Sequence, residues 1–182
     1  MENAVQLLAN AMHFVIYFAS LNNLKLNATL LLKIIFGSEV QVLASFNDSI
    51  TGAIMVKGPY GPIPDGHKKA IDYLIRQKKI KVNDNSNEIT YTSISLPDIT
   101  QFSEEKLVIL REACSSMCIN FTATMLSNYI HNNETWQLAK IGDRIPLVGF
   151  WPHKRIIPSP EKMKALSEEA ASFKIPQGWS KD

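Results

Sequence analysis

Residues 1–20 constrain the fold most, because they predict a helix that is apolar on nearly every side. Two stripes at helical spacing run along opposite sides of it: Val5, Leu8, Met12, Val15 and Ala19 on one, and Leu7, Ala11, Phe14 and Phe18 on the other. A helix without a polar face is buried inside a fold or against a partner. We therefore expect this helix to lie within the fold.

The composition is that of an ordinary globular protein, with 182 residues, 46% of them hydrophobic, and a formal net charge of +2. This length fits one domain, or one domain with an appendage. No uncharged apolar run approaches the roughly 18 residues of a membrane helix. Residues 1–19 also lack the basic start of a secretory signal. The sequence thus predicts a cytoplasmic protein that contacts no membrane.

Two cysteines, Cys114 and Cys118, lie four apart in a helical pattern. A disulfide at that spacing would strain the helix. A zinc pair would need two further ligands, and the histidines show no paired metal-ligand spacing. We expect two reduced thiols in a reducing compartment, with no metal and no cofactor.

The remaining pattern predicts a mainly α (α+β) fold, a compact helical domain with a small β-hairpin. Asn27 is a good N-cap for a second helix, which runs to Phe46 unless Gly37 ends it early. Residues 53–57 predict a short strand. Residues 58–64 read Gly-Pro-Tyr-Gly-Pro-Ile-Pro and predict a rigid loop that is neither helix nor central strand.

A basic amphipathic helix is predicted at 66–79 and a hairpin at 80–93. The helix is expected to turn four apolar residues inward: Ala70, Ile71, Leu74 and Ile75. The segment 68–81 also carries six basic residues and one acid, the basic residues being Lys68, Lys69, Arg76, Lys78, Lys79 and Lys81. A basic helix before a hairpin is typical of winged-helix DNA-binding proteins. Nucleic acid is therefore an alternative partner, and a solvated lysine face is the simpler interpretation.

Ser103 is expected to cap the next helix, whose core-facing seam repeats every three or four residues. The seam residues are Leu107, Leu110, Cys114, Met117 and Phe121. Thr122 can cap a further helix through Ile130, and a short helix follows at 134–140.

Proline-rich sequence from Val148 onward predicts an irregular tail with one short helix at 159–172. We therefore divide the chain into a domain at 1–147 and a C-terminal tail at 148–182, to which the sequence assigns no role.

Catalytic and nucleotide-binding motifs are missing, among them Gly-x-Gly-x-x-Gly, the phosphate loop, Gly-x-Ser-x-Gly and His-Glu-x-x-His. Glu104 and Glu105 stand at a predicted helix start, where carboxylates are favourable. His131 stands at a predicted helix end, where an imidazole can bond the last free carbonyls. We predict a protein that is not an enzyme and has no catalytic residue.

Three separated fragments of the sequence form a recognisable series. The first is Leu-Leu-Leu-Lys-Ile-Ile-Phe at 30–36, and the second joins Ser-Ile-Thr-Gly at 49–52 to Tyr-Gly-Pro-Ile-Pro at 60–64. The third is an ordered series of single residues: Leu126, His131, Trp136, Ala139, Gly142, Ile145 and Pro146. Taken in this order, the fragments resemble the Panacea domain of the SocA-like antitoxin family, and order and spacing fit over roughly residues 5–147.

The resemblance implies a mostly helical, non-catalytic bacterial or phage domain that neutralises a cognate toxin by direct contact, and some members deliver the toxin to a protease. A phage-associated protein acting on a host protein is the third possibility. The residues implied in shaping or forming the partner surface are Tyr60, Gly61, Pro62, His131 and Trp136. In this hypothesis His131 hydrogen-bonds the backbone of the loop at 58–64, and the loop meets the toxin. The simpler alternative is that these residues only pack the core and its corners.

Overall fold

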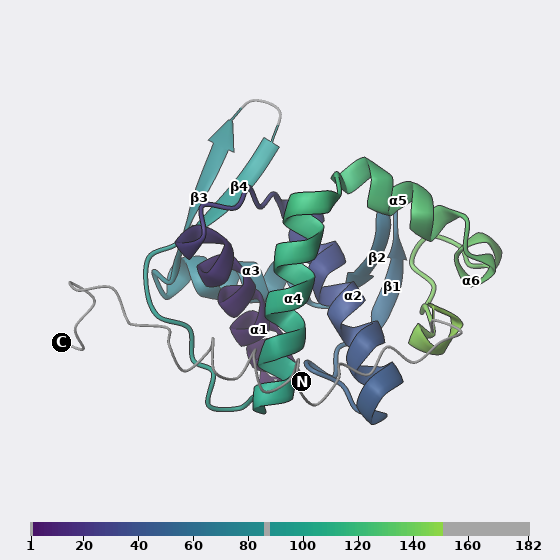
Figure 1. Ribbon diagram of the computed structural model, residues 1–182, viewed down its shortest axis with the longest axis horizontal. Coiled ribbons are helices and arrows are strands. Elements are labelled where there is room, and N and C mark those ends of the chain that lie inside the picture. The colour runs from purple at the N-terminus through teal and green to yellow at the C-terminus, as the bar shows by residue number, and fades with distance from the viewer. Residues whose placement is uncertain (1, 86–87, 151–182) are drawn as a thin grey trace.

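The structure, a computed structural model, describes residues 2–85 and 88–150 and confirms the mainly helical fold class (Figure 1). Its α-helices are α1 (Glu2–Leu21), α2 (Ala28–Phe46), α3 (His67–Arg76), α4 (Glu104–Asn120), α5 (Ala123–His131) and α6 (Glu134–Leu138). Two antiparallel hairpins join β1 (Met55–Gly58) to β2 (Gly61–Pro64) and β3 (Ile80–Asn85) to β4 (Glu88–Ser93). A short 3₁₀ helix, η1, spans Leu147–Phe150.

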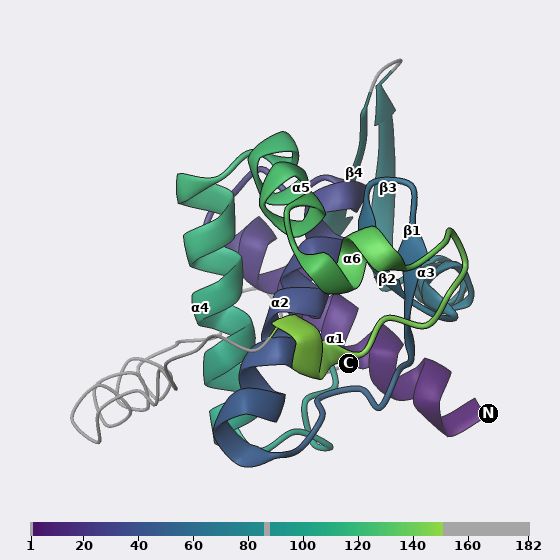
Figure 2. The ribbon, with the colours of Figure 1, turned by 90° about the vertical axis from the view of Figure 1, so that its right-hand side faces the viewer.

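Helix α1 lies inside the molecule, as its all-round apolar pattern predicts. Figures 1 and 2 show it between α3 and α4, and it also packs against α2 and β4. Leu8, Met12, Val15 and Ile16 are completely buried. By length and composition alone α1 and α2 could each cross a membrane, but more than half of each such stretch is buried within the protein. Core packing accounts for their hydrophobicity.

Helix α2 begins where the N-cap predicts and continues past the glycine that could have ended it. The Asn27 side chain accepts a hydrogen bond from the Leu30 amide at 2.8 Å. Gly37 sits mid-helix, and a Cβ there would lie 2.5 Å from the Met117 methyl carbon. The expected run of the helix to Phe46 is therefore confirmed, and Gly37 makes room for close packing of α4 on α2 instead of ending the helix.

The segment 58–64 is not a loop throughout, which corrects the prediction from its prolines. It forms the turn of a hairpin and the whole of strand β2, with Pro62 and Pro64 opposite Lys57 and Met55. Proline lacks an N–H, but alternate pairs in an antiparallel ladder exchange no hydrogen bonds. The sequence suggested no strand because this alternation depends on register.

Strand β1 has a second partner on its other edge, the segment 142–145. The Lys57 amide donates to the Asp143 carbonyl at 2.8 Å, and the Ile145 amide donates to the Met55 carbonyl at 2.7 Å. A bridge also pairs Val56 with Arg144. The backbone groups of Met55 and Lys57 thus face away from β2, which leaves Pro62 and Pro64 where no amide donor is needed.

The basic helix and the second hairpin form as expected, and this hairpin projects from the helical body (Figures 1 and 2). Ala70 and Leu74 of α3 are buried against the core, but Ile75 is 40% exposed. The expected inward position of Ile75 is wrong, because it lies a further 100° around the helix from Leu74 and falls off the core face.

The C-terminal helices match their predicted caps with two differences. Thr122 accepts a hydrogen bond from the Met125 amide at 3.1 Å, whereas the Ser103 side chain caps no amide although it occupies the N-cap position. Phe121 is 42% exposed, so it leaves the predicted seam of α4, because its backbone is already extended after the helix end. The helix predicted at 159–172 lies outside the described residues.

Candidate protein-binding site around the β1–β2 turn

Two hydrogen bonds to the backbone carbonyl of Tyr60 hold the turn between β1 and β2 in place. Lys33 of α2 donates a hydrogen bond to this oxygen from Nζ at 2.6 Å, and Ser127 of α5 donates from Oγ at 2.9 Å. Gly61 follows with φ of 141°, and a Cβ there would lie 3.2 Å from Lys33 Nζ. The glycine therefore permits the close approach of the turn to the lysine.

Lys33 is an unusual member of this site because its side chain is almost fully buried, with 3% of the residue exposed. Burial lowers the pKa of Lys33 to about 8, since an ammonium group is disfavoured away from water. Sequence reasoning missed this role. The available signal was a single lysine within the apolar run 30–36.

A second lysine ties the hairpin to α6. Lys57 of β1 donates from Nζ to the Trp136 carbonyl at 2.7 Å and to the Ala139 carbonyl at 3.0 Å. The same Nζ lies 4.5 Å from the centroid of the Trp136 ring, which places the cation against an aromatic system. Trp136 is buried and stacks on His131, with ring centroids 5.0 Å apart and 13° between the planes.

His131 acts differently from the sequence hypothesis. Among the described residues no hydrogen bond joins its side chain to the loop at 58–64, and its Nε2 atom is buried without a partner. Lys33 and Ser127 hold the turn instead. His131 influences the hairpin through the Trp136 ring, which it supports, and through Lys57 beyond it.

A buried carboxylate orders the chain just before β1. Glu39 of α2 accepts four hydrogen bonds, from Ser49 Oγ, the Ile50 amide, the Thr51 amide and Thr51 Oγ1. The donors are 2.5–2.9 Å from the carboxylate oxygens, and Glu39 is completely buried. Sequence reasoning also missed Glu39, whose partners lie ten to twelve residues further along the chain.

An exposed apolar surface adjoins the braced turn. We call it the α5 surface and define it by Met125 and Tyr129, which lie four residues apart on one face of α5. Tyr60 is 69% exposed and Tyr129 is 79% exposed, while Met125 lies one turn before Tyr129 on α5. Residues 113–133, which include all of α5, contain no Asp, Glu, Lys or Arg. Helix α5 therefore exposes large apolar side chains from a stretch of sequence that contains no charged residue.

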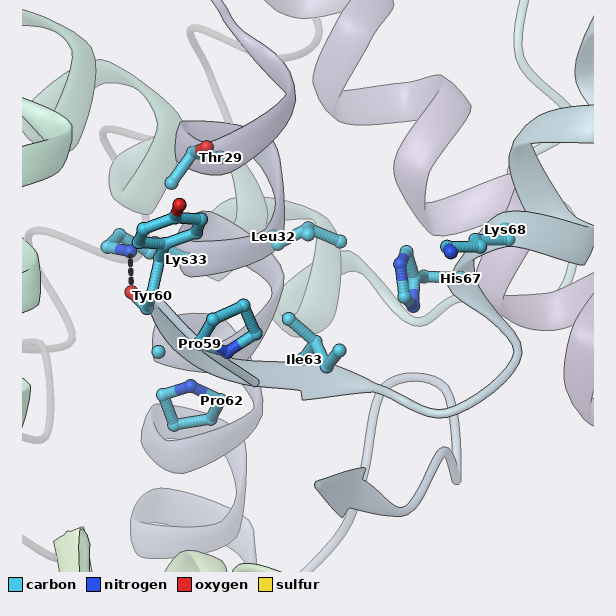
Figure 3. A pocket seen from close by; sticks show the side chains of 10 residues that line it. Thr29, Leu32, Lys33, Pro59, Tyr60, Pro62, Ile63, His67 and Lys68 are labelled. Atoms are coloured by element: carbon cyan, nitrogen blue, oxygen red, sulfur yellow. Dashed lines mark hydrogen bonds between the residues drawn. The ribbon is translucent and has the colours of Figure 1, made fainter. Parts of the chain in front are cut away.

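A cavity of about 270 Å³, which we call the hairpin cavity, lies between the turn, α2 and the start of α3 (Figure 3). Leu32, Pro59 and Ile63 give it apolar walls. In the view of Figure 3 these residues lie between Lys33 and Tyr60 at one end and His67 and Lys68 at the other. Of the predicted site residues, Tyr60, Gly61 and Pro62 line this cavity, whereas His131 and Trp136 do not.

The predicted basic residues are distributed over α3 and the second hairpin. Exposed side chains are those of Lys68, Lys69, Arg76, Lys78 and Lys81, and Lys79 is half-buried near the Tyr73 ring. Within the described part of the chain none of them forms a salt bridge. Only Lys68 reaches the hairpin cavity.

These features define a class of protein: a helical domain whose core helices support a braced β-turn beside a neutral apolar surface. The model of a protein family, described as antitoxin SocA-like, Panacea domain, matches residues 31–137. This match covers more than half of the chain, and the chain therefore belongs to this family, as the three sequence fragments predict. Neither the curated proteins nor the solved structures gave a match.

Proposed function

We propose that this protein is an antitoxin that neutralises a cognate protein toxin by direct binding in the cytoplasm, without catalysing a reaction. Membership of the SocA-like antitoxin family supports this class of function. The observation that carries the proposed binding mode is the α5 surface, where Met125 and Tyr129 are exposed within a stretch of the chain that contains no charged residue.

A protein partner suits this surface better than a nucleic acid does. The cores of protein–protein interfaces are enriched in tyrosine and methionine and depleted in charged residues. Nucleic-acid binding relies on Lys and Arg contacts to phosphates. The stretch 113–133, which supplies Met125 and Tyr129, contains neither residue type. The bracing by Lys33 and Ser127 also supports binding, because a preorganised turn loses little entropy when it docks.

The direct test uses the small open reading frame next to the gene. Its product is expressed alone and together with this protein, and growth is followed. We expect the product alone to arrest growth, and co-expression to restore growth and yield a co-purifying complex. If no neighbouring product arrests growth, or if the arrest persists despite soluble antitoxin, the proposed function is wrong.

Two substitutions locate the interface. Met125→Lys and Tyr129→Lys each place a charge on the α5 surface, and each is expected to weaken toxin binding by about tenfold or more. Ile89→Lys is the matched control, because Ile89 is also an exposed apolar residue but lies on β4 in the projecting hairpin. Weakening by Ile89→Lys equal to that by Tyr129→Lys would exclude the α5 surface.

Further measurements separate the alternatives. A toxin half-life that shortens with the antitoxin present indicates delivery to a protease, and an unchanged half-life indicates blocking. Capture of a host protein without any toxic neighbour would favour the phage-associated alternative. If α3 and the hairpin bind DNA, the logarithm of the affinity should fall with the logarithm of the salt concentration, with a slope of about 0.9 per phosphate contact. This binding should be lost when Lys78, Lys79 and Lys81 become Glu.

A further inference from the structure

Among the described residues, the hairpin cavity is lined by positively charged residues and by no acidic residue. Two of its lining residues carry a positive charge, namely Lys33 and Lys68. Its volume of about 270 Å³ lies just below the roughly 300–1,000 Å³ of pockets for drug-sized ligands. Space is therefore available for one side chain or a small acid.

Lys33 leaves positive charge at one end of the cavity without an acidic partner. No carboxylate among the described residues forms an ion pair with it, and its one hydrogen bond goes to the neutral carbonyl of Tyr60. An ammonium group has three donors. A buried charge is stabilised when an opposite charge approaches, so this end of the cavity favours an anion.

The other end is formed by the first turn of α3. His67 contacts the Pro64 carbonyl through Nδ1 at 3.0 Å, and a carbonyl accepts only, so Nδ1 carries the proton. The Lys68 side chain is exposed at the rim. No side chain caps the first turn of α3, and no acidic residue lies in it. The positive end of the helix dipole thus adds to the charge of Lys68.

We propose that the hairpin cavity binds a carboxylate borne on an apolar stem and presented by the partner protein, as an Asp or Glu side chain or a C-terminus beside an apolar residue. This inference rests on the proposed function, because it names the partner chemistry that the hairpin accepts. Leu32, Pro59 and Ile63 contact the apolar part, and the positive charges of Lys33 and Lys68 attract the carboxylate. The α5 surface then supplies a separate apolar contact.

A small probe tests the cavity without the toxin. The full chain is titrated with 3-phenylpropionate and, as a neutral match, with 3-phenylpropionamide, while NMR follows the amides of Tyr60 and Gly61. We expect the acid to bind with a Kd on the order of millimolar and the amide at least about tenfold more weakly. Binding also raises the pKa of Lys33 from about 8. Equal binding of acid and amide, or no binding of either, overturns the proposal.

A matched pair of lysines provides the second test. Lys68 lines the cavity, and its neighbour Lys69 is exposed but does not line it. Lys68→Ala is expected to weaken both probe and toxin binding by about threefold to tenfold, and Lys69→Ala to leave both unchanged. Equal effects of the two substitutions overturn the cavity proposal. If the wild-type protein rescues growth while both cavity tests fail, only this inference is wrong, whereas failed rescue removes the proposed function itself.

Discussion

Replacing Glu39 by glutamine is expected to lower the free energy of unfolding by about 2–4 kcal/mol. The carboxylate accepts two hydrogen bonds on each oxygen, one from a backbone amide and one from a hydroxyl. In glutamine an NH₂ group replaces one of the two oxygens. This NH₂ group then faces the N–H of either Ile50 or Thr51, so that two hydrogen-bond donors meet. The facing hydroxyl can rotate to accept, but the amide cannot. One buried unsatisfied donor costs about 1–3 kcal/mol, and the remaining bonds lose their charge assistance.

The assay is urea unfolding at neutral pH, followed by circular dichroism. The midpoint should fall while the m-value stays constant, because the surface exposed on unfolding is unchanged. Glu105→Gln is the matched control, since Glu105 is exposed at the start of α4 and should change stability by about 0.5 kcal/mol or less. If Glu39→Gln is as stable as Glu105→Gln, the four hydrogen bonds do not hold the segment before β1.

Three further predictions concern ionisation and capping. Burial, with the nearby Lys79 charge, lowers the pKa of His13 to about 4, so the unfolded state takes up a proton first as the pH falls. Stability should drop by about 3 kcal/mol between pH 6.5 and 4, and urea unfolding of His13→Gln should lack that part of the slope. Lys33 titrates at about 8 when folded and near 10.5 when unfolded, so the folded state releases its proton first as the pH rises. Stability should therefore increase by about 2–3 kcal/mol from pH 8 to 10.5 relative to Lys33→Met, and parallel profiles would contradict this reasoning. Asn27→Ala removes the N-cap of α2 and a hydrogen bond to Glu88, and should lower the thermal midpoint through a loss of about 1–2 kcal/mol, whereas an unchanged midpoint would show that the cap is dispensable.

The helices could be predicted from sequence because their signals are local. Asn27 and Thr122 cap amides within three residues of themselves, and the apolar stripes of α1 repeat within a few turns. Strand β2 could not be predicted in the same way. Its prolines are acceptable only because the Met55 and Lys57 backbone groups turn toward residues 142–145, and that pairing joins segments far apart in the chain.

The site could be predicted only in part for the same reason. The family fragments pointed to Tyr60 and Trp136, and the structure places both beside the braced hairpin. The groups that do the bracing, Lys33 and Lys57, act across 27 and 79 residues of sequence. A lone lysine in an apolar helix gives no indication of which distant carbonyl it will meet, so the role given to His131 fell to Lys33.

The position of β1 between β2 and residues 142–145 has a consequence for biosynthesis. Several groups that hold the hairpin come late in the chain. They are the Trp136 and Ala139 carbonyls that accept hydrogen bonds from Lys57, the Ser127 hydroxyl, and Ile145, which pairs with the edge of β1. Domains are made from the N-terminus onward. A nascent chain on the ribosome therefore has Lys33 but lacks the other contacts that hold the hairpin until nearly the whole domain has emerged. Products cut short before Ser127 would carry Tyr60 with Lys33 as the one remaining donor to its carbonyl.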